Sequence, residues 1–93
     1  NGLGTDHAWA GNIMVAGGSV KGSQILGEYP ERLDDTGVTS VGRGRLIPTR
    51  SWEAIWNAIA GWFGVNEEHM AEVLPHLSNF PDGHLFTTDD LFN

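Results

Sequence analysis

The clearest pattern along the chain is a row of large apolar side chains that begins just after its midpoint. They recur at three- and four-residue spacing, which is typical of one face of an α-helix. The residues are Trp52, Ile55, Trp56, Ile59 and Phe63. Ser51 is a suitable N-cap and Gly64 a suitable C-cap. Because burying each of these side chains would contribute about 1.5–3 kcal/mol, we expect the helix to dock against something large.

A second, shorter helix is predicted directly after the first. Asn66 is a suitable N-cap, and apolar residues again follow helical spacing. These apolar residues are Met70, Val73, Leu74 and Leu77. Pro75 disfavours helical backbone at the residue before it, so the helix should end near Leu74. The acidic tail, residues 81–93, either packs loosely or is held by its few apolar residues.

The N-terminal part of the chain has the pattern of apolar runs and glycines that is typical of short strands. Residues 12–16 form an apolar run closed by Gly17 and Gly18, as in a buried strand, and residues 19–26 form a weaker one. The two glycines permit a hairpin, although the edge of a parallel sheet also fits. Residues 29–50 are polar and irregular. The predicted fold class is therefore α/β, or α+β for this chain alone, with short N-terminal strands, an irregular loop and two C-terminal helices.

Composition and charge narrow the classes of function. The 93 residues suffice for one small domain, and the absence of Cys excludes disulfides and thiolate metal sites. A formal net charge of −7 repels nucleic acid and anionic lipid. No apolar run is long enough to span a bilayer. The opening, Asn1-Gly2-Leu3-Gly4, reads like the middle of a domain, so we expect a piece of a longer protein.

The sharpest candidate for chemistry is the dipeptide Asp6-His7 in a loop that follows Gly4. A carboxylate oxygen and an imidazole nitrogen suit zinc, manganese or a similar ion, and the glycine permits the irregular backbone that would turn both toward one ion. Zinc needs three or four ligands, so the others would come from elsewhere. The alternative is an ordinary turn in which the Asp is hydrogen-bonded.

A second candidate is the pair Arg43 and Arg45 around Gly44. Two guanidinium groups could hold a phosphate or sulfate, and the glycine would let the backbone approach it. The alternative is that these arginines pair with the many carboxylates of the chain. Lys21 could hold an anion with less geometric precision.

For several other residues, an ordinary structural role competes with a functional one. Glu31, Asp34 and Asp35 could bind calcium, but they lack the alternating ligand pattern of a calcium loop, so a solvated turn is expected. Trp9 either walls the site or packs in the core. The Trp52 and Trp56 pair fits core packing better than a sugar-stacking platform, because its periodicity is helical. His69 and His76 lie in or just after the second predicted helix, so solvated or helix-end positions are expected for them. His84, in a loop near the end of the chain, is a remote candidate ligand.

Several motifs in series resemble one family. They are Gly4-Thr5-Asp6-His7-Ala8-Trp9, Gly17-Gly18-Ser19-Val20-Lys21-Gly22, Gly27-Glu28-Tyr29-Pro30, Gly42-Arg43-Gly44-Arg45-Leu46-Ile47-Pro48-Thr49 and Ser51-Trp52. In order and spacing, from Gly4 to about Phe80, they resemble the family catalogued as domain of unknown function 1501. That family resembles the alkaline phosphatase and sulfatase superfamily, whose members have a central sheet, a metal centre and an upstream nucleophile. The resemblance implies that residues 1–93 are the C-terminal portion of one larger hydrolase-like domain.

The resemblance also implies a metal site. The Asp-His pair that ligates metal in the superfamily matches Asp6 and His7, so the expected cofactor is a divalent ion such as zinc, calcium or manganese. Ala8 departs from the Gly that often follows the pair, and the nucleophile and remaining ligands lie outside this chain. Export to the periplasm or the outside of the cell is implied as well, since family members often carry secretion signals.

Two functions remain open at this point. The first is a metal-dependent hydrolase of phosphoric or sulfuric esters, inactive as this piece alone, with Arg43 and Arg45 helping to hold the anion. The second is a non-catalytic structural or assembly protein that retains the hydrolase scaffold. In either case the expected partner is the remainder of the polypeptide or an assembly.

Overall fold

The computed structural model describes residues 2–4 and 9–93, which divide into two compact units. One unit contains residues 27–49 together with the described residues up to Met14, and it consists of turns and loops. We call it the loop unit. The other contains Val15–Leu26 and Arg50–Asn93, and every helix of the described residues lies in it. We call it the helical unit.

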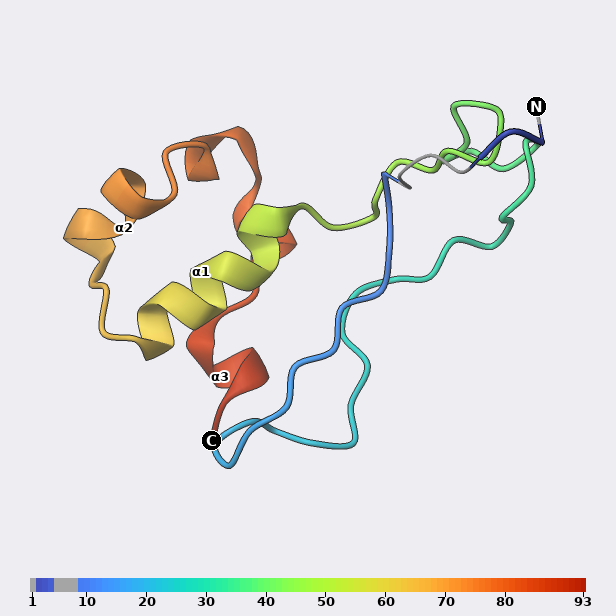
Figure 1. Cartoon of the computed structure of the whole chain (residues 1–93). Coiled ribbons are helices and arrows are strands. Elements are labelled where there is room, and N and C mark those ends of the chain that lie inside the picture. The colour runs from blue at the N-terminus through green and yellow to red at the C-terminus, as the bar shows by residue number, and fades with distance from the viewer. Residues whose placement is uncertain (1, 5–8) are drawn as a thin grey trace. The chain divides into compact units, whose positions relative to one another are not determined.

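The helical unit is built around its longest helix. Its elements are α1 at Trp52–Trp62, α2 at Glu67–Val73, the 3₁₀ turns η1 at Leu77–Asn79 and η2 at Asp82–His84, and α3 at Thr88–Leu91. Helix α1 packs against both α2 and α3 (Figure 1). The two predicted C-terminal helices are therefore confirmed. Leu74 leaves the helical conformation, with φ −126° and ψ 78°, directly before Pro75, as predicted.

The core of the helical unit lies on the small-residue face of α1. Ala54 and Ala58 are fully buried, and Leu91 and Phe92 are only 3% and 7% exposed. The ring of Phe92 also stacks on Trp62, with centroids 4.9 Å apart. The side of α1 that carries the two alanines thus faces the tail of the chain, and Ile55, Ile59 and Trp62 also contact this core.

Helix α3 is too short for periodicity to reveal it, but polar contacts mark its start. The Asp90 carboxylate accepts hydrogen bonds from the backbone N–H and the hydroxyl of Thr87, at 2.7 and 2.8 Å. The hydrogen bond from the Thr87 N–H, followed by the one from its hydroxyl, lowers the pKa of Asp90. On α1, a Cβ added at Gly61 would stand 2.6 Å from Thr88 Oγ1, so the absence of a side chain there lets α3 approach.

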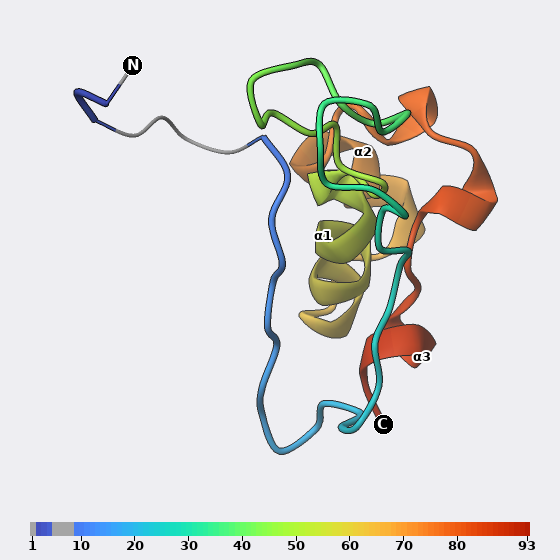
Figure 2. The same cartoon turned by 90° about the vertical axis from the view of Figure 1, so that its right-hand side faces the viewer.

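The predicted α/β fold class is wrong, because the described residues contain three α-helices and no strand or sheet. Residues 12–16 are extended and have no strand partner among the described residues (Figure 2), and Ile13 and Met14 are 53% and 92% exposed. In residues 19–26, Val20 makes one isolated antiparallel bridge, to Phe92. An apolar run predicts a segment that tends to be buried, but a strand also needs a neighbour for its backbone hydrogen bonds. The described part of this chain supplies no such neighbour for residues 12–16, and for residues 19–26 it supplies only the short contact with the end of the chain.

The loop unit contains a tight turn that resembles the end of a hairpin. Ser40 and Leu46 form an isolated antiparallel bridge, and the Ile47 N–H donates to the Thr39 carbonyl at 2.8 Å. Three consecutive residues at the tip have positive φ angles. They are Gly42 at 81°, Arg43 at 59° and Gly44 at 74°. Arg43 is the unusual member, because a side chain seldom adopts this region.

Candidate functional site

The predicted metal ligands Asp6 and His7 lie outside the described residues. Within residues 2–4 and 9–93, no group of three or more His, Cys, Asp or Glu side chains gathers closely enough to hold a metal ion. The metal site therefore stays a prediction from the sequence.

The Arg43 turn is organised around a carboxylate of its own unit. Asp35 accepts hydrogen bonds from the backbone N–H groups of Arg43 and Gly44, each at 3.1 Å, and from the Ser40 hydroxyl at 3.3 Å. The bonds from Gly44 and then Arg43 lower the pKa of Asp35. Successive N–H groups in such a turn form a concavity suited to an anion. In this structure the anion is Asp35.

The two predicted anion-binding arginines make different contacts. Arg45 donates from Nε to the Gly42 carbonyl at 3.0 Å and from a terminal nitrogen to the Val41 carbonyl at 3.1 Å, which closes the turn. Its guanidinium also lies 5.9 Å from the ring centroid of Trp9. Arg43 is exposed, and its guanidinium has no partner among the described residues. Anion binding by the pair stays a prediction, with Arg43 as the member open to a ligand.

Asp34, in the acidic stretch before this turn, bonds to residues close to it in the sequence. Asp34 pairs with Arg32 at 2.6 Å and accepts from the Thr36 N–H at 2.9 Å. The Arg32 hydrogen bond, followed by those from Thr36, lowers the pKa of Asp34 to about 2. These contacts match the solvated turn expected for this stretch.

His84, the remote candidate ligand, contacts the start of α1 instead. Its Nε2 accepts the backbone N–H of Ser51 at 2.9 Å and lies 3.1 Å from the Ser51 hydroxyl. Its ring stacks on Phe80, with centroids 4.9 Å apart. The Ser51 side chain makes no capping bond to the helix, and the imidazole accepts the N–H of Ser51 itself, which has no partner within the helix. Nothing in the local sequence around Ser51 indicates a partner so far along the chain.

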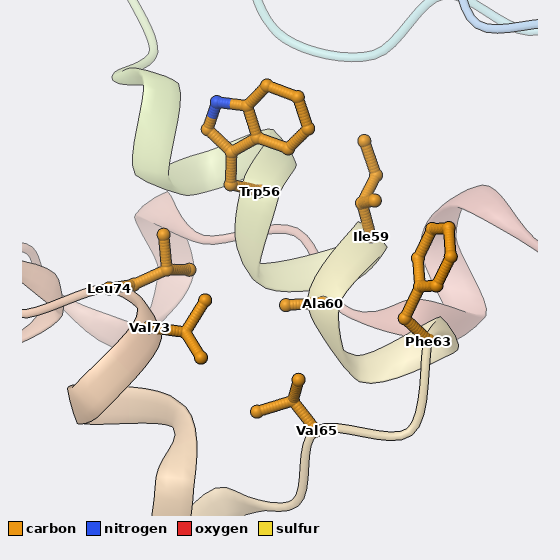
Figure 3. A pocket seen from close by; sticks show the side chains of 7 residues that line it. All are labelled: Trp56, Ile59, Ala60, Phe63, Val65, Val73 and Leu74. Atoms are coloured by element: carbon orange, nitrogen blue, oxygen red, sulfur yellow. The ribbon is translucent and has the colours of Figure 1, made fainter.

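Part of the row of large apolar residues on α1, namely Trp56, Ile59 and Phe63, lines an open groove. Ile55 and Ile59 also pack against the core. Figure 3 shows side chains of α1 and of the α2 end on two sides of this groove, with Val65 between them. Its volume is about 480 Å³, and its lining is entirely apolar: Trp56, Ile59, Ala60, Phe63, Val65, Val73 and Leu74. Trp56 is 45% exposed and Phe63 75%. The chain by itself thus leaves uncovered part of the face that the sequence pattern predicts to be docked.

The basic residues all precede, in the sequence, the helices that form the groove. A count along the sequence would have found this asymmetry. Residues 1–50 carry all five basic residues and five acids, whereas residues 51–93 carry seven acids and no Lys or Arg. The formal charge of −7 therefore belongs entirely to the part that forms the three α-helices. Overall composition conceals this asymmetry, because the first fifty residues are formally neutral.

Comparisons with protein-family models, curated proteins and solved structures found no match to this chain. The family resemblance therefore rests on the motifs quoted above. In the described part of the chain, no helix is both long enough and apolar enough to cross a membrane.

Proposed function

We propose that this chain is the C-terminal portion of a metal-dependent hydrolase of phosphoric or sulfuric esters. One observation supports this most directly: several of its largest apolar side chains lie on the surface. Trp52, Trp56 and Phe63 are 60%, 45% and 75% exposed. Large contiguous apolar surfaces mark places where further polypeptide packs. A piece of a larger hydrolase body, as the serial motifs imply, has this property.

The proposed contribution to the metal centre comes from Asp6 and His7. A carboxylate oxygen and an imidazole nitrogen fit zinc, manganese or calcium as part of a ligand set, although they do not complete one. A bound divalent ion would supply Lewis-acid polarisation of the ester oxygens. Asp6 and His7 would position that ion, while the nucleophile would come from outside these 93 residues. Arg43, whose guanidinium is exposed, would help to hold the anionic substrate. Export from the cytoplasm is part of this proposal.

The test is metal analysis of the intact protein beside an Asp6→Ala variant. We expect a bound divalent metal and phosphatase or sulfatase activity in the parent, and loss of both in the variant. Glu31→Ala is the matched control, because it removes an exposed carboxylate outside the Asp-His motif and should change neither. Equal folding of all three proteins, with metal and activity in none, would instead support the non-catalytic structural or assembly protein.

A further inference from the structure

The open groove between α1 and the end of α2 has a consistent chemistry. Every lining residue is apolar, and the groove is bounded by helical segments on two sides (Figure 3). Its Phe63 and Val73 are 75% and 53% exposed, so both are available to a partner side chain. A groove between helices is a common receptor for the apolar stripe of another helix.

The charged residues of the segment that forms α1 and α2 all have one sign. From Ser51 to the end of α2 the ionised side chains are Glu53, Glu67, Glu68 and Glu72, without any Lys or Arg. The three glutamates of α2 are exposed and have no cationic partner in the described part of the chain. Complementary potential favours a binder that is positive.

The same charge argues against two other occupants. A second copy that docked through residues 51–93 would bring seven acids and no Lys or Arg against the same residues of this chain, and like charges across an interface are unfavourable. An anionic membrane surface would be repelled in the same way.

We infer that the α1–α2 groove receives an amphipathic helix whose apolar stripe is flanked by Lys and Arg, contributed by the remainder of the hydrolase body. The source of that helix rests on the function proposed above. Its chemistry rests independently on the apolar lining and on the acidic surroundings.

The chemistry can be tested on the 93-residue chain with a synthetic helical peptide of Leu and Lys, with Leu at helical spacing. A peptide with Glu in place of each Lys is the matched control. Calorimetry and tryptophan fluorescence would follow binding, because Trp56 lines the groove. We expect the Lys peptide to bind at least ~10-fold more tightly than the Glu peptide. Its affinity should fall as salt rises from about 0.05 to 0.5 M, because salt screens exposed charges.

Variants separate the groove from general charge attraction. Phe63→Ser preserves every charge and should weaken binding of the Lys peptide by about 10-fold, as expected for an exposed aromatic anchor. Val38→Ser, in the loop unit, removes an apolar side chain that is also exposed and should have no effect. Replacing Glu67, Glu68 and Glu72 by Gln should lower both the affinity and its salt dependence. If circular dichroism shows that Phe63→Ser is unfolded, Val73→Ser replaces it.

Three results would overturn the inference. They are equal binding of the two peptides, unchanged binding by Phe63→Ser, and formation of a dimer or of a complex with phosphatidylglycerol vesicles that Phe63→Ser abolishes. Metal analysis gives a separate readout. Peptide binding without metal in the intact protein would end the hydrolase proposal, and with it the source of the helix, but would leave the chemistry of the groove standing. Bound metal without peptide binding would end the groove inference alone.

Discussion

Polar contacts stabilise the loop unit internally, whereas apolar contacts stabilise the helical unit. In the loop unit, the carboxylates of Asp34 and Asp35 accept hydrogen bonds from neighbouring backbone and side-chain groups. In the helical unit, Leu91 and Phe92 are buried against the alanine face of α1. Exposed polar contacts are individually weak and sensitive to pH, whereas buried apolar contacts are strong and sensitive to cavities. The two units should therefore respond to different perturbations.

The largest effect should come from Phe92→Ala. This change empties a buried position that also stacks on Trp62, so we expect the helical unit to lose about 3–5 kcal/mol of unfolding free energy. Urea denaturation followed by tryptophan fluorescence would measure it. Phe63→Ala removes the same ring from an exposed position and should cost less than about 1 kcal/mol. Similar losses in the two variants would mean that burial does not distinguish these sites.

A smaller effect is expected where α1 meets α3. Gly61→Ala gains up to about 1 kcal/mol of helix propensity, but its Cβ would stand 2.6 Å from Thr88 Oγ1. We expect the single variant to be destabilised and the same change in a Thr88→Ala background to be stabilising. A double-mutant cycle on unfolding free energies should give a favourable coupling of about 1 kcal/mol. Additive effects would show that the close approach is absent in solution.

A local effect is expected from Asp35→Ala. Without the carboxylate, the N–H groups of Arg43 and Gly44 lose their acceptor, so their amide hydrogen exchange should accelerate. Exchange in α1 should stay unchanged, because that helix belongs to the other unit. Asp35→Asn keeps one acceptor oxygen and should show an intermediate rate. Exchange that changes throughout the chain would contradict the separation of the two units.

The smallest effect concerns the titration of Asp34. Its pKa in the folded chain is about 2, against an ordinary value of 3.8, chiefly because of the Arg32 hydrogen bond. A lowered folded pKa means that the carboxylate contributes stability above pH 3.8 and loses it as the pH falls towards 2. Carboxyl NMR titration should show this midpoint, and Arg32→Ala should raise it towards 3.8. An unchanged midpoint in that variant would exclude Arg32 as the main cause.

The sequence predicted the helices better than it predicted what covers them. Periodicity located α1 and α2 and their ends, because an amphipathic repeat and a proline act locally. It did not reveal that Ala54 and Ala58 would be the buried residues, since that depends on the approach of α3. The prediction of strands was wrong for a related reason. The run at residues 12–16 has apolar character, but no local signal specifies a pairing partner.

The candidate site was predictable only in part. The tight turn at Gly42–Gly44 follows from its glycines. The acceptor of its N–H groups, Asp35, lies eight and nine positions before the two donors, Arg43 and Gly44, and no local pattern indicates it. The contact between His84 and Ser51 spans 33 positions, which no local pattern encodes. Two missed features were accessible: Thr87 and Asp90 have capping-box spacing, and the charge asymmetry around position 50 needed only a count.

The pairing of residues 19–21 with the end of the chain has a consequence for folding kinetics. The Lys21 N–H donates to the Leu91 carbonyl, and the Asn93 N–H donates to the Ser19 carbonyl, each at 2.8 Å. A further bond joins Lys21 to Asp89 across 68 positions. Helices form within about a microsecond, but contacts so distant in sequence require a diffusive search whose entropy cost grows with loop length. Refolding of the helical unit should therefore show early helical signal and a later step in which these two segments meet.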